Sequence, residues 1–205
     1  LVVKRDIPTA VASAEGLPEA YRATVYTLLD TYRRKLTRNL LRDRYYEMHQ
    51  APKNLGISVP PNLRNLEQVI GWPAKAVNAL ANRSQFDGYV CTDEDTAAVL
   101  ASVVKGNGLK RRYRKAVKSE LKHSCSFLAV TRSAAGMPVV SAYSATAAAA
   151  LWSERLNRVA AGMAVVDRDC TPRGDGEPVW IDVYTDDAVV TIRRGPGGSV
   201  WRATV

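Results

Sequence analysis

The segment His123–Ser126 combines a possible base with a thiol and two hydroxyl groups. A catalytic nucleophile needs a base within hydrogen-bond reach and a third group that orients this base. In an extended segment, however, His123 and Cys125 point to one face while the two serines point to the other, and no third orienting group is evident in the sequence. A free cysteine is most often a small buried hydrophobic residue. We therefore interpret the segment as a packed strand and predict no catalytic residues and no enzyme.

Metal ligation has no better support in the sequence. The chain has two histidines, His49 and His123, and three cysteines, Cys91, Cys125 and Cys170. Structural zinc sites use closely spaced ligand pairs such as C-x2-C or H-x3-H, and these five residues form no such pair. Three scattered cysteines are also too few for a disulfide framework, so we expect reduced, intracellular thiols. The sequence predicts neither a metal nor a cofactor.

Two further features have groups that bind ligands in other proteins, and both are better explained as loops. Asp167 and Asp169 share a face if their segment is extended, and paired carboxylates can exchange protons or hold a hard cation. We favour the alternative, a polar strand end that leads into the loop at 171–176. The segment Gly195–Gly198 follows a strand, but a strand and not a helix comes next, so it lacks the helix N-terminus of a phosphate cradle. We predict a turn there.

The strongest site-like feature is the segment from Lys105 to Lys122, which holds eight basic residues and one acidic residue, Glu120. On a helix these side chains can line a phosphate backbone without reading its sequence, form a solvated face that shields the core, or meet an acidic neighbouring subunit. No base-reading motif occurs, so sequence-specific recognition is not expected. The candidate surface comprises Lys110, Arg111, Arg112, Arg114, Lys115 and Lys118, together with Arg34, Arg38 and Arg42 of an earlier basic cluster.

Helices are predicted to position both basic groups. Apolar residues recur every three or four positions from Glu19 to His49, which predicts one long amphipathic helix. Pro18 fits its first turn and Pro52 prevents its continuation. Its basic residues, Arg33, Arg34, Lys35, Arg38, Arg42 and Arg44, crowd the central and C-terminal turns, where cations suit the helix dipole.

The middle of the chain predicts shorter elements. An extended linker is expected at 52–61. A helical region follows, with Leu63, Leu66, Ile70, Val77, Leu80 and Ala81 on one face, and Pro73 must kink it or open a new helix. Residues 86–91 suggest a short strand. Thr92 and Asp95 form a weak capping box before another helix, which stops at Gly106–Gly108. The next helix, 109–122, has an apolar side made of Leu109, Tyr113, Ala116, Val117 and Leu121.

Beyond this helix the hydrophobic period changes to two, which predicts antiparallel strands. The expected strands are Ser124–Thr131, Pro138–Tyr143, Val179–Tyr184, Val189–Arg193 and one containing Val200 and Trp201. The fold class is therefore α+β. We divide the chain into an N-terminal extension (1–16), a helical part with a long arm helix (17–122) and an antiparallel β part (123–205), which together form one domain.

Length and charge set further limits. At 205 residues the chain can form one compact domain with an arm. The net charge of +9 arises in residues 1–122, because residues 123–205 are neutral overall. This field can attract polyphosphate or an acidic protein surface. No apolar run of membrane-spanning length and no secretory signal occur. The chain starts at Leu1 and stops at Val205 directly after an expected strand, so we expect the natural protein to extend further.

Several motifs follow one another along the chain: the Arg-rich helix ending in Tyr45–His49, Asn54–Pro61, the Trp-Pro helix Trp72–Arg83, Phe86–Tyr89, Asn107-x-Leu109, the strand Ser124–Val130 and the apolar-Trp-Ser turn Leu151–Ser153. In this order they resemble the N-terminal part of portal proteins from long-tailed bacteriophages and prophages. Glu47 stands where the family often has a small residue, and Ser124 where it has Gly. The resemblance covers nearly the whole chain.

The resemblance implies a structural subunit of a dodecameric portal ring at one capsid vertex, without an active site. Through such a ring the terminase motor drives double-stranded DNA, and head-completion and capsid or scaffold proteins bind to it. This chain would correspond to the outer wing, truncated at its C-terminus, in a virion assembled in the bacterial cytoplasm, with no membrane involved. A nonspecific nucleic-acid-binding module that uses the basic helix 109–122 is the alternative function, and an unrecognised enzyme is a third.

Local propensity does not decide whether the segment 146–166 forms a helix or strands. Its Ala147–Ala150 run consists of the strongest helix formers, while the flanking residues look extended. We favour a strand, a turn around Glu154–Asn157 and a second strand, and this preference rests on the family resemblance.

Overall fold

The computed structural model describes residues 6–49, 71–170, 176–195 and 200–205. Contacts divide the chain into two compact units: unit 1 comprises residues 1–37 and 145–205, and unit 2 comprises residues 38–144. Helices precede antiparallel sheets along the chain, which confirms the predicted α+β class. The predicted division at 122/123 separated helices from strands. The two units instead collect the elements that contact one another, so each unit contains both helices and strands.

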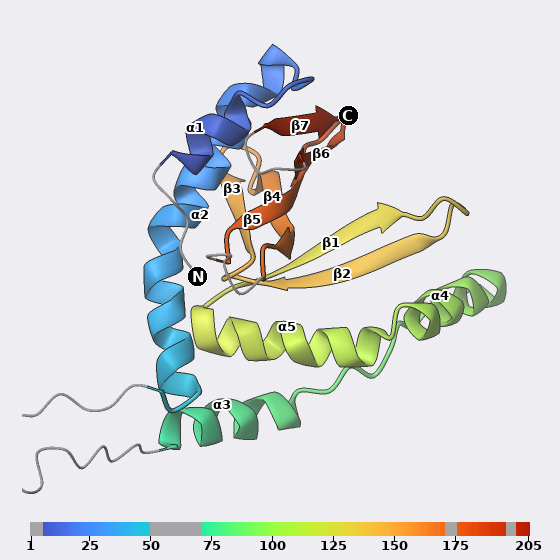
Figure 1. The fold of residues 1–205 in the computed structure, drawn as a ribbon. Helices are drawn as coiled ribbons and strands as arrows, with labels where there is room; N and C mark the ends of the chain where they lie inside the picture. The colour runs from blue at the N-terminus through green and yellow to red at the C-terminus, as the bar shows by residue number, and fades with distance from the viewer. Residues whose placement is uncertain (1–5, 50–70, 171–175, 196–199) are drawn as a thin grey trace, which may run out of the picture. The chain divides into compact units, whose positions relative to one another are not determined.

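Unit 1 contains a five-stranded antiparallel sheet in which the strands pair in chain order (Figure 1). Its strands are β3 (Ala148–Ser153), β4 (Arg158–Arg168), β5 (Pro178–Tyr184), β6 (Val189–Arg194) and β7 (Trp201–Thr204). The register places Ile181 opposite Ile192 and Val183 opposite Val190. All four side chains are fully buried, while the residues between them are not, so one face of the sheet forms the core.

Helices from the N-terminal part of the chain supply the other side of this core. They are α1 (Ile7–Ala12) and the first part of α2 (Glu19–Tyr46), which lie beside the sheet in Figure 1. In α2, Val25, Leu28, Leu29 and Tyr32 are buried at the predicted spacing. The segment expected as an N-terminal extension also takes part in the core, because Val11 is fully buried.

The segment 146–166, for which the sequence left helix and strand both possible, forms strands, as the family resemblance suggested. β3 and β4 pair antiparallel with Ala148 opposite Ala164, and the turn falls at residues 154–157. Helix propensity differs little among residues and is a weak preference. Here Ala148 and Ala149 are buried in a paired strand, so tertiary packing overrides the local preference for a helix.

In the part of unit 2 that the structure describes, the last part of α2 is joined by three further helices and a β-hairpin. These are α3 (Trp72–Arg83), α4 (Glu94–Gly106) and α5 (Leu109–His123), with β1 (Ser126–Arg132) and β2 (Pro138–Ser144). In Figure 1, α5 lies between α3 and the hairpin. Both hairpin strands were predicted, and Gly136 supplies the positive φ of 76° that its turn needs. Pro73 lies in the first turn of α3, as expected of a proline that opens a helix.

Some expectations for unit 2 were wrong, and others lie outside the described residues. Residues 86–91 form no strand, because Phe86 packs against Tyr113 and nothing in the described chain pairs with this segment. Asp93, not Thr92, caps α4 by accepting a hydrogen bond from the Thr96 amide at 2.8 Å. The expected linker at 52–61, the apolar residues 63–70 and the Gly-rich turn at 196–198 fall outside the described residues.

Candidate docking surfaces

Helix α5 presents the predicted basic surface. It starts after Gly108, whose φ of 57° suits glycine, and ends at His123, where the C-cap Ser124 also has a positive φ, 69°. The predicted packed strand at His123–Ser126 is therefore wrong, because the helix continues to His123 and β1 starts only at Ser126. On a helix with 3.6 residues per turn, positions four apart lie above one another. One face of α5 is therefore basic. We call Lys110, Arg111, Arg114, Lys115 and Lys118 the basic face; all are exposed except Lys118, which is half-buried.

Among the described residues, none of the five side chains of the basic face makes an ion pair. Two other sides of α5 are covered, one by the hairpin and one by α3. The helix buries Leu109, Ala116, Ser119 and His123, whereas Leu121 is 39% exposed, so the apolar side differs from the predicted one. The basic face is thus available to a partner.

The other four candidate residues are distributed differently. Arg112 lies on the same face of α5 as the buried Leu109 and Ala116. It donates from Nε to the Asn107 carbonyl at 2.6 Å. Arg42 donates to the His123 carbonyl at 2.8 Å. Arg34, in unit 1, pairs with Asp30 at 2.9 Å. Arg38 is exposed at the start of unit 2. The structure therefore joins five of the nine candidates into one face and gives three of the rest partners within the chain.

Asn107 fixes the junction between α4 and α5, a role that sequence reasoning missed. Its side chain is buried and donates to the carbonyls of Val103 at 3.0 Å and Pro138 at 2.9 Å, while its oxygen accepts from the Val140 amide at 2.9 Å. Two of these bonds tie the start of α5 to β2 and the third holds the end of α4, so together they orient the basic face relative to the hairpin.

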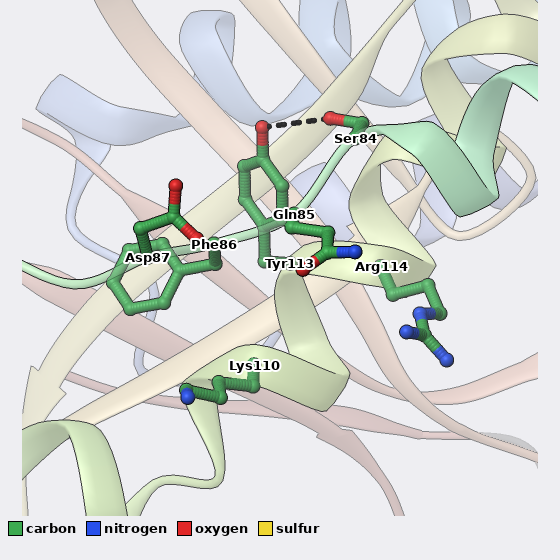
Figure 2. Close-up of a pocket in the computed structure, with 7 residues that line it drawn as sticks. All are labelled: Ser84, Gln85, Phe86, Asp87, Lys110, Tyr113 and Arg114. Atoms are coloured by element: carbon green, nitrogen blue, oxygen red, sulfur yellow. Dashed lines mark hydrogen bonds between the residues drawn. The ribbon is translucent and has the colours of Figure 1, made fainter.

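Beside the basic face lies a hollow lined by residues 84–87 and three side chains of α5 (Figure 2). Tyr113 anchors it, because its hydroxyl lies 3.1 Å from the Ser84 hydroxyl and its ring lies 5.7 Å from that of Phe86. Lys110 and Arg114 supply positive charge. A second hollow, lined by Tyr89 and apolar residues of α4, adjoins the first at Asp87 and Lys110.

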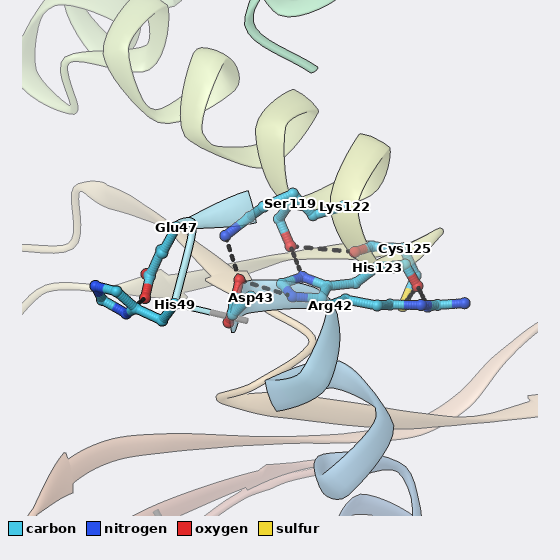
Figure 3. Close-up of polar contacts among 8 residues, drawn as sticks. All are labelled: Arg42, Asp43, Glu47, His49, Ser119, Lys122, His123 and Cys125. Carbon is cyan, nitrogen blue, oxygen red and sulfur yellow. Dashed lines mark hydrogen bonds and ion pairs between the residues drawn. The ribbon is translucent and has the colours of Figure 1, made fainter. Parts of the chain in front are cut away.

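His123 occupies a buried polar cluster and not an accessible active site (Figure 3). Its Nε2 lies 3.2 Å from Asp43 Oδ1, and its Nδ1 lies 3.4 Å from Ser119 Oγ. An acid, a base and a hydroxyl in this order resemble a catalytic triad. However, the Ser119 hydroxyl donates to the Cys125 carbonyl at 3.2 Å, and His123 and Ser119 are only 3% and 4% exposed. No substrate can reach the hydroxyl in this state.

The cluster instead joins the C-terminal end of α2 to that of α5. Lys122 Nζ lies 2.5 Å from Asp43 Oδ1, so the carboxylate accepts from a cation and an imidazole. Burial lowers the pKa of His123, an effect that Asp43 opposes and that Lys122 and Arg42 strengthen. Desolvation raises the pKa of the Cys125 thiol, the opposite of what an activated nucleophile requires.

Asp43 lies 80 residues from His123 in the sequence, so spacing could not identify it as the missing third group. The i, i+4 spacing of Ser119 and His123 was the one local signal available.

The remaining chemical candidates lie at strand ends: Asp167 is near the end of β4, and Asp169 and Gly195 directly follow β4 and β6. The Asp167 carboxylate accepts a hydrogen bond from the Arg168 amide at 2.8 Å, and the Asp169 amide donates to the Glu177 carbonyl at 2.9 Å. The Gly195 amide donates to the Val200 carbonyl at 2.8 Å and joins β6 to β7. In the described part of the chain, no cluster of His, Cys, Asp and Glu has the makings of a metal site. The helices described there include none that is long and apolar enough to cross a membrane.

These features define an α+β protein whose most distinctive described surface is the exposed basic face of α5. A protein-family model described as "Phage portal protein, SPP1 Gp6-like" matches residues 27–203. The match covers most of the chain, so the chain belongs to this phage portal family. This match confirms the predicted resemblance. No curated protein matched the sequence.

Proposed function

We propose that this chain is a structural subunit of a portal ring at the capsid vertex, which serves DNA packaging and ejection and joins head to tail, and that it catalyses no reaction. The observation that carries the proposal is the family match over residues 27–203. Double-stranded DNA would pass through the ring, and the proposed partners are terminase, capsid or scaffold proteins and head-completion proteins. The protein would reside in the virion.

The buried Asp43–His123–Ser119 cluster supports the noncatalytic part of the proposal. A triad needs a hydroxyl that is open to substrate, whereas Ser119 is buried and donates to a backbone carbonyl.

Electron microscopy of the protein at its full natural length tests the proposal. We expect rotationally symmetric annular particles with a central hole, and native mass spectrometry of the same sample should give one dominant high-order assembly. Compact single particles at concentrations where portal rings assemble would contradict it.

The alternative function, nonspecific binding of nucleic acid, is favoured by the basic face. It requires affinity for duplex DNA that falls steeply with salt concentration, because binding releases the counterions of the phosphates. Changing Lys110, Arg111, Arg114 and Lys115 to Gln should then weaken binding and reduce the salt slope. Arg155→Gln, an exposed residue outside this face, is the control. Unchanged affinity in the fourfold variant would reject the basic face as a DNA site.

A further inference from the structure

Helix α4 lacks the packing that a helix of its length needs. It has thirteen residues, and none of them is buried. Isolated helices of this length are marginal in water, and most helical stability in proteins comes from packing of an apolar face. Val99 is 61% exposed, although α4 is the most apolar helix of unit 2. Residues 87–89 and Lys110 line a hollow together with one side of it.

Unit 2 as a whole buries little apolar surface in the described residues. Its buried hydrophobic side chains are Ala81, Leu109 and Ala116, whereas Val90, next to α4, is fully exposed and Tyr89 is 59% exposed. Exposed apolar groups gathered on one element mark interaction sites. Of these, Tyr89 lines an open hollow together with Leu100, Ala101 and Val104 of α4, while Val99 is exposed on the same helix.

The same unit carries two unpaired surfaces of opposite charge. The first turn of α4 is acidic, with Asp93, Glu94 and Asp95 all exposed, and Asp87 is exposed nearby in sequence. Among the described residues, none of these carboxylates is in an ion pair. The basic face of α5 is equally unpaired. Figure 1 shows α4 extending past the N-terminal end of α5, so the acidic turn and the basic face are separate parts of one unit.

We propose that α4 is an intersubunit contact: its acidic first turn and exposed apolar side dock on the basic face of α5 in a second copy of this chain. The inference rests on the proposed portal function. Charge complementarity selects the occupant, because the chain carries both halves of the contact. Two different surfaces of identical subunits make a head-to-tail interface, and head-to-tail interfaces generate closed rings when the rotation closes.

Two charge-reversed variants of the full-length protein test this contact. One carries Glu94→Lys and Asp95→Lys, and the other carries Arg111→Glu and Lys115→Glu. Each places like charges across every proposed contact, so each should lose rings in electron microscopy and native mass spectrometry. The chain with all four changes should regain rings, and so should an equimolar mixture of the two variants, because both restore opposite charges.

The controls are Glu154→Lys and Arg155→Glu in the β3–β4 turn, which reverse exposed charges outside α4 and α5 and should leave ring formation unchanged. Circular dichroism checks the fold of each variant. Lysines in the first turn of α4 oppose the helix dipole, so the α5 variant provides a second test without this cost.

The outcomes separate the two proposals. Rings in both charge-reversed variants would overturn the docking inference alone. A parent protein without rings would overturn the portal function and the inference with it. If the α5 variant keeps its rings but loses binding to duplex DNA, the basic face is a DNA site and the inference is wrong.

Discussion

His123 is the buried titratable group of the polar cluster, and its environment predicts how stability depends on pH. Burial lowers its pKa in the folded state from the ordinary value of 6.5, and Lys122 and Arg42 act in the same direction while Asp43 opposes them. Between the lowered pKa and 6.5 the unfolded chain binds more protons than the folded chain, so stability rises with pH in this window. The contribution of neutral His123 to the free energy of unfolding is therefore complete above pH 6.5, and it is lost as the pH falls through the pKa of His123 in the folded state.

Urea unfolding of the protein at pH 7.5 and at pH 5.5, followed by circular dichroism, measures this effect. We expect a lower free energy of unfolding at the acidic pH, and a smaller difference between the two values in His123→Gln, which cannot titrate. The exposed His49 remains in both proteins as an internal control. An equal pH dependence in parent and variant would show that another group is responsible.

The buried hydroxyl of Tyr32 allows a prediction of how much a polar contact in unit 1 contributes to the free energy of unfolding. Its side chain is 1% exposed, and its hydroxyl donates to the Thr146 carbonyl at 2.8 Å while accepting from Arg168. Tyr32→Phe should cost about 1–3 kcal/mol, because Arg168 loses one acceptor. Tyr32→Ala should cost about 3–5 kcal/mol, the usual cost of removing a buried ring. Tyr26→Phe is the control, since Tyr26 is 47% exposed.

Tryptophan fluorescence during chemical unfolding reports mainly on unit 1, which holds Trp152, Trp180 and Trp201. The fourth tryptophan, Trp72 in unit 2, is already 78% exposed in the folded chain. Equal stability of Tyr32→Phe and the parent would mean that the bonds from Tyr32 and Arg168 to the Thr146 carbonyl are redundant.

Among the elements, those with a strong local pattern were predictable. The apolar spacing of α2, the stop at Gly106–Gly108 and the alternation of Ile181 and Val183 each give a clear periodic or turn signal. The structure confirms all three within three residues at the ends. The alanine run in β3 was ambiguous because its propensity opposes its tertiary packing. The segment 86–91 was misassigned because Phe86 packs against Tyr113 of α5 and Tyr89 packs against Phe86, so these aromatic residues do not join a sheet.

The contents of the candidate site were less predictable than its elements. Helical spacing alone identifies the basic face of α5. It could not show that Asp43 would meet His123, because that contact depends on how distant segments pack. Nor could it show that Arg112 would turn to the Asn107 carbonyl, five residues earlier, which requires the turn between α4 and α5. Sequence patterns report the faces of one element, whereas ion pairs between elements require the fold.

The turn between α1 and α2 predicts a marked cost for one added methyl group. Gly16 has a φ of 81°, and a Cβ there would lie 2.8 Å from the Ala203 carbonyl oxygen. This approach exists because Glu15 pairs with β7 through hydrogen bonds to Trp201 and Ala203. Gly16→Ala should therefore destabilise unit 1 by more than the roughly 1–2 kcal/mol of a left-handed conformation alone.

Gly136→Ala is the matched control, because Gly136 has a φ of 76° and nothing within 4 Å of an added Cβ. Circular dichroism in urea compares the two variants with the parent. If Gly16→Ala lowers the free energy of unfolding no more than Gly136→Ala does, β7 can move away from the added methyl group without a measurable cost, and the prediction is wrong.

For the whole molecule, the two units differ in what holds them together. Unit 1 has an extensive apolar core in which helices cover one face of a sheet, while the buried groups described in unit 2 include Asn39, Asn107, Ser119 and His123. Buried polar groups need every hydrogen bond to be made, so unit 2 depends on a few specific contacts. It is also the unit with the exposed apolar helix α4 and the basic face. These differences are consistent with unit 1 as a self-sufficient scaffold and unit 2 as the docking part.

This difference leads to a prediction about chain topology. Unit 2 is inserted between residues 37 and 145 of unit 1, and the hydrogen bond from Tyr32 to Thr146 brings the two ends of unit 1 close together. Replacing residues 38–144 by a flexible linker of about six residues, which spans up to about 20 Å, should leave the five-stranded sheet and its helices folded. We expect cooperative thermal unfolding and dispersed amide signals in NMR spectra. Because the core of unit 1 lies within residues 1–37 and 145–205, a shortened chain without cooperative unfolding would show that unit 1 needs unit 2 to fold. The same chain carrying Tyr32→Ala serves as the destabilised control.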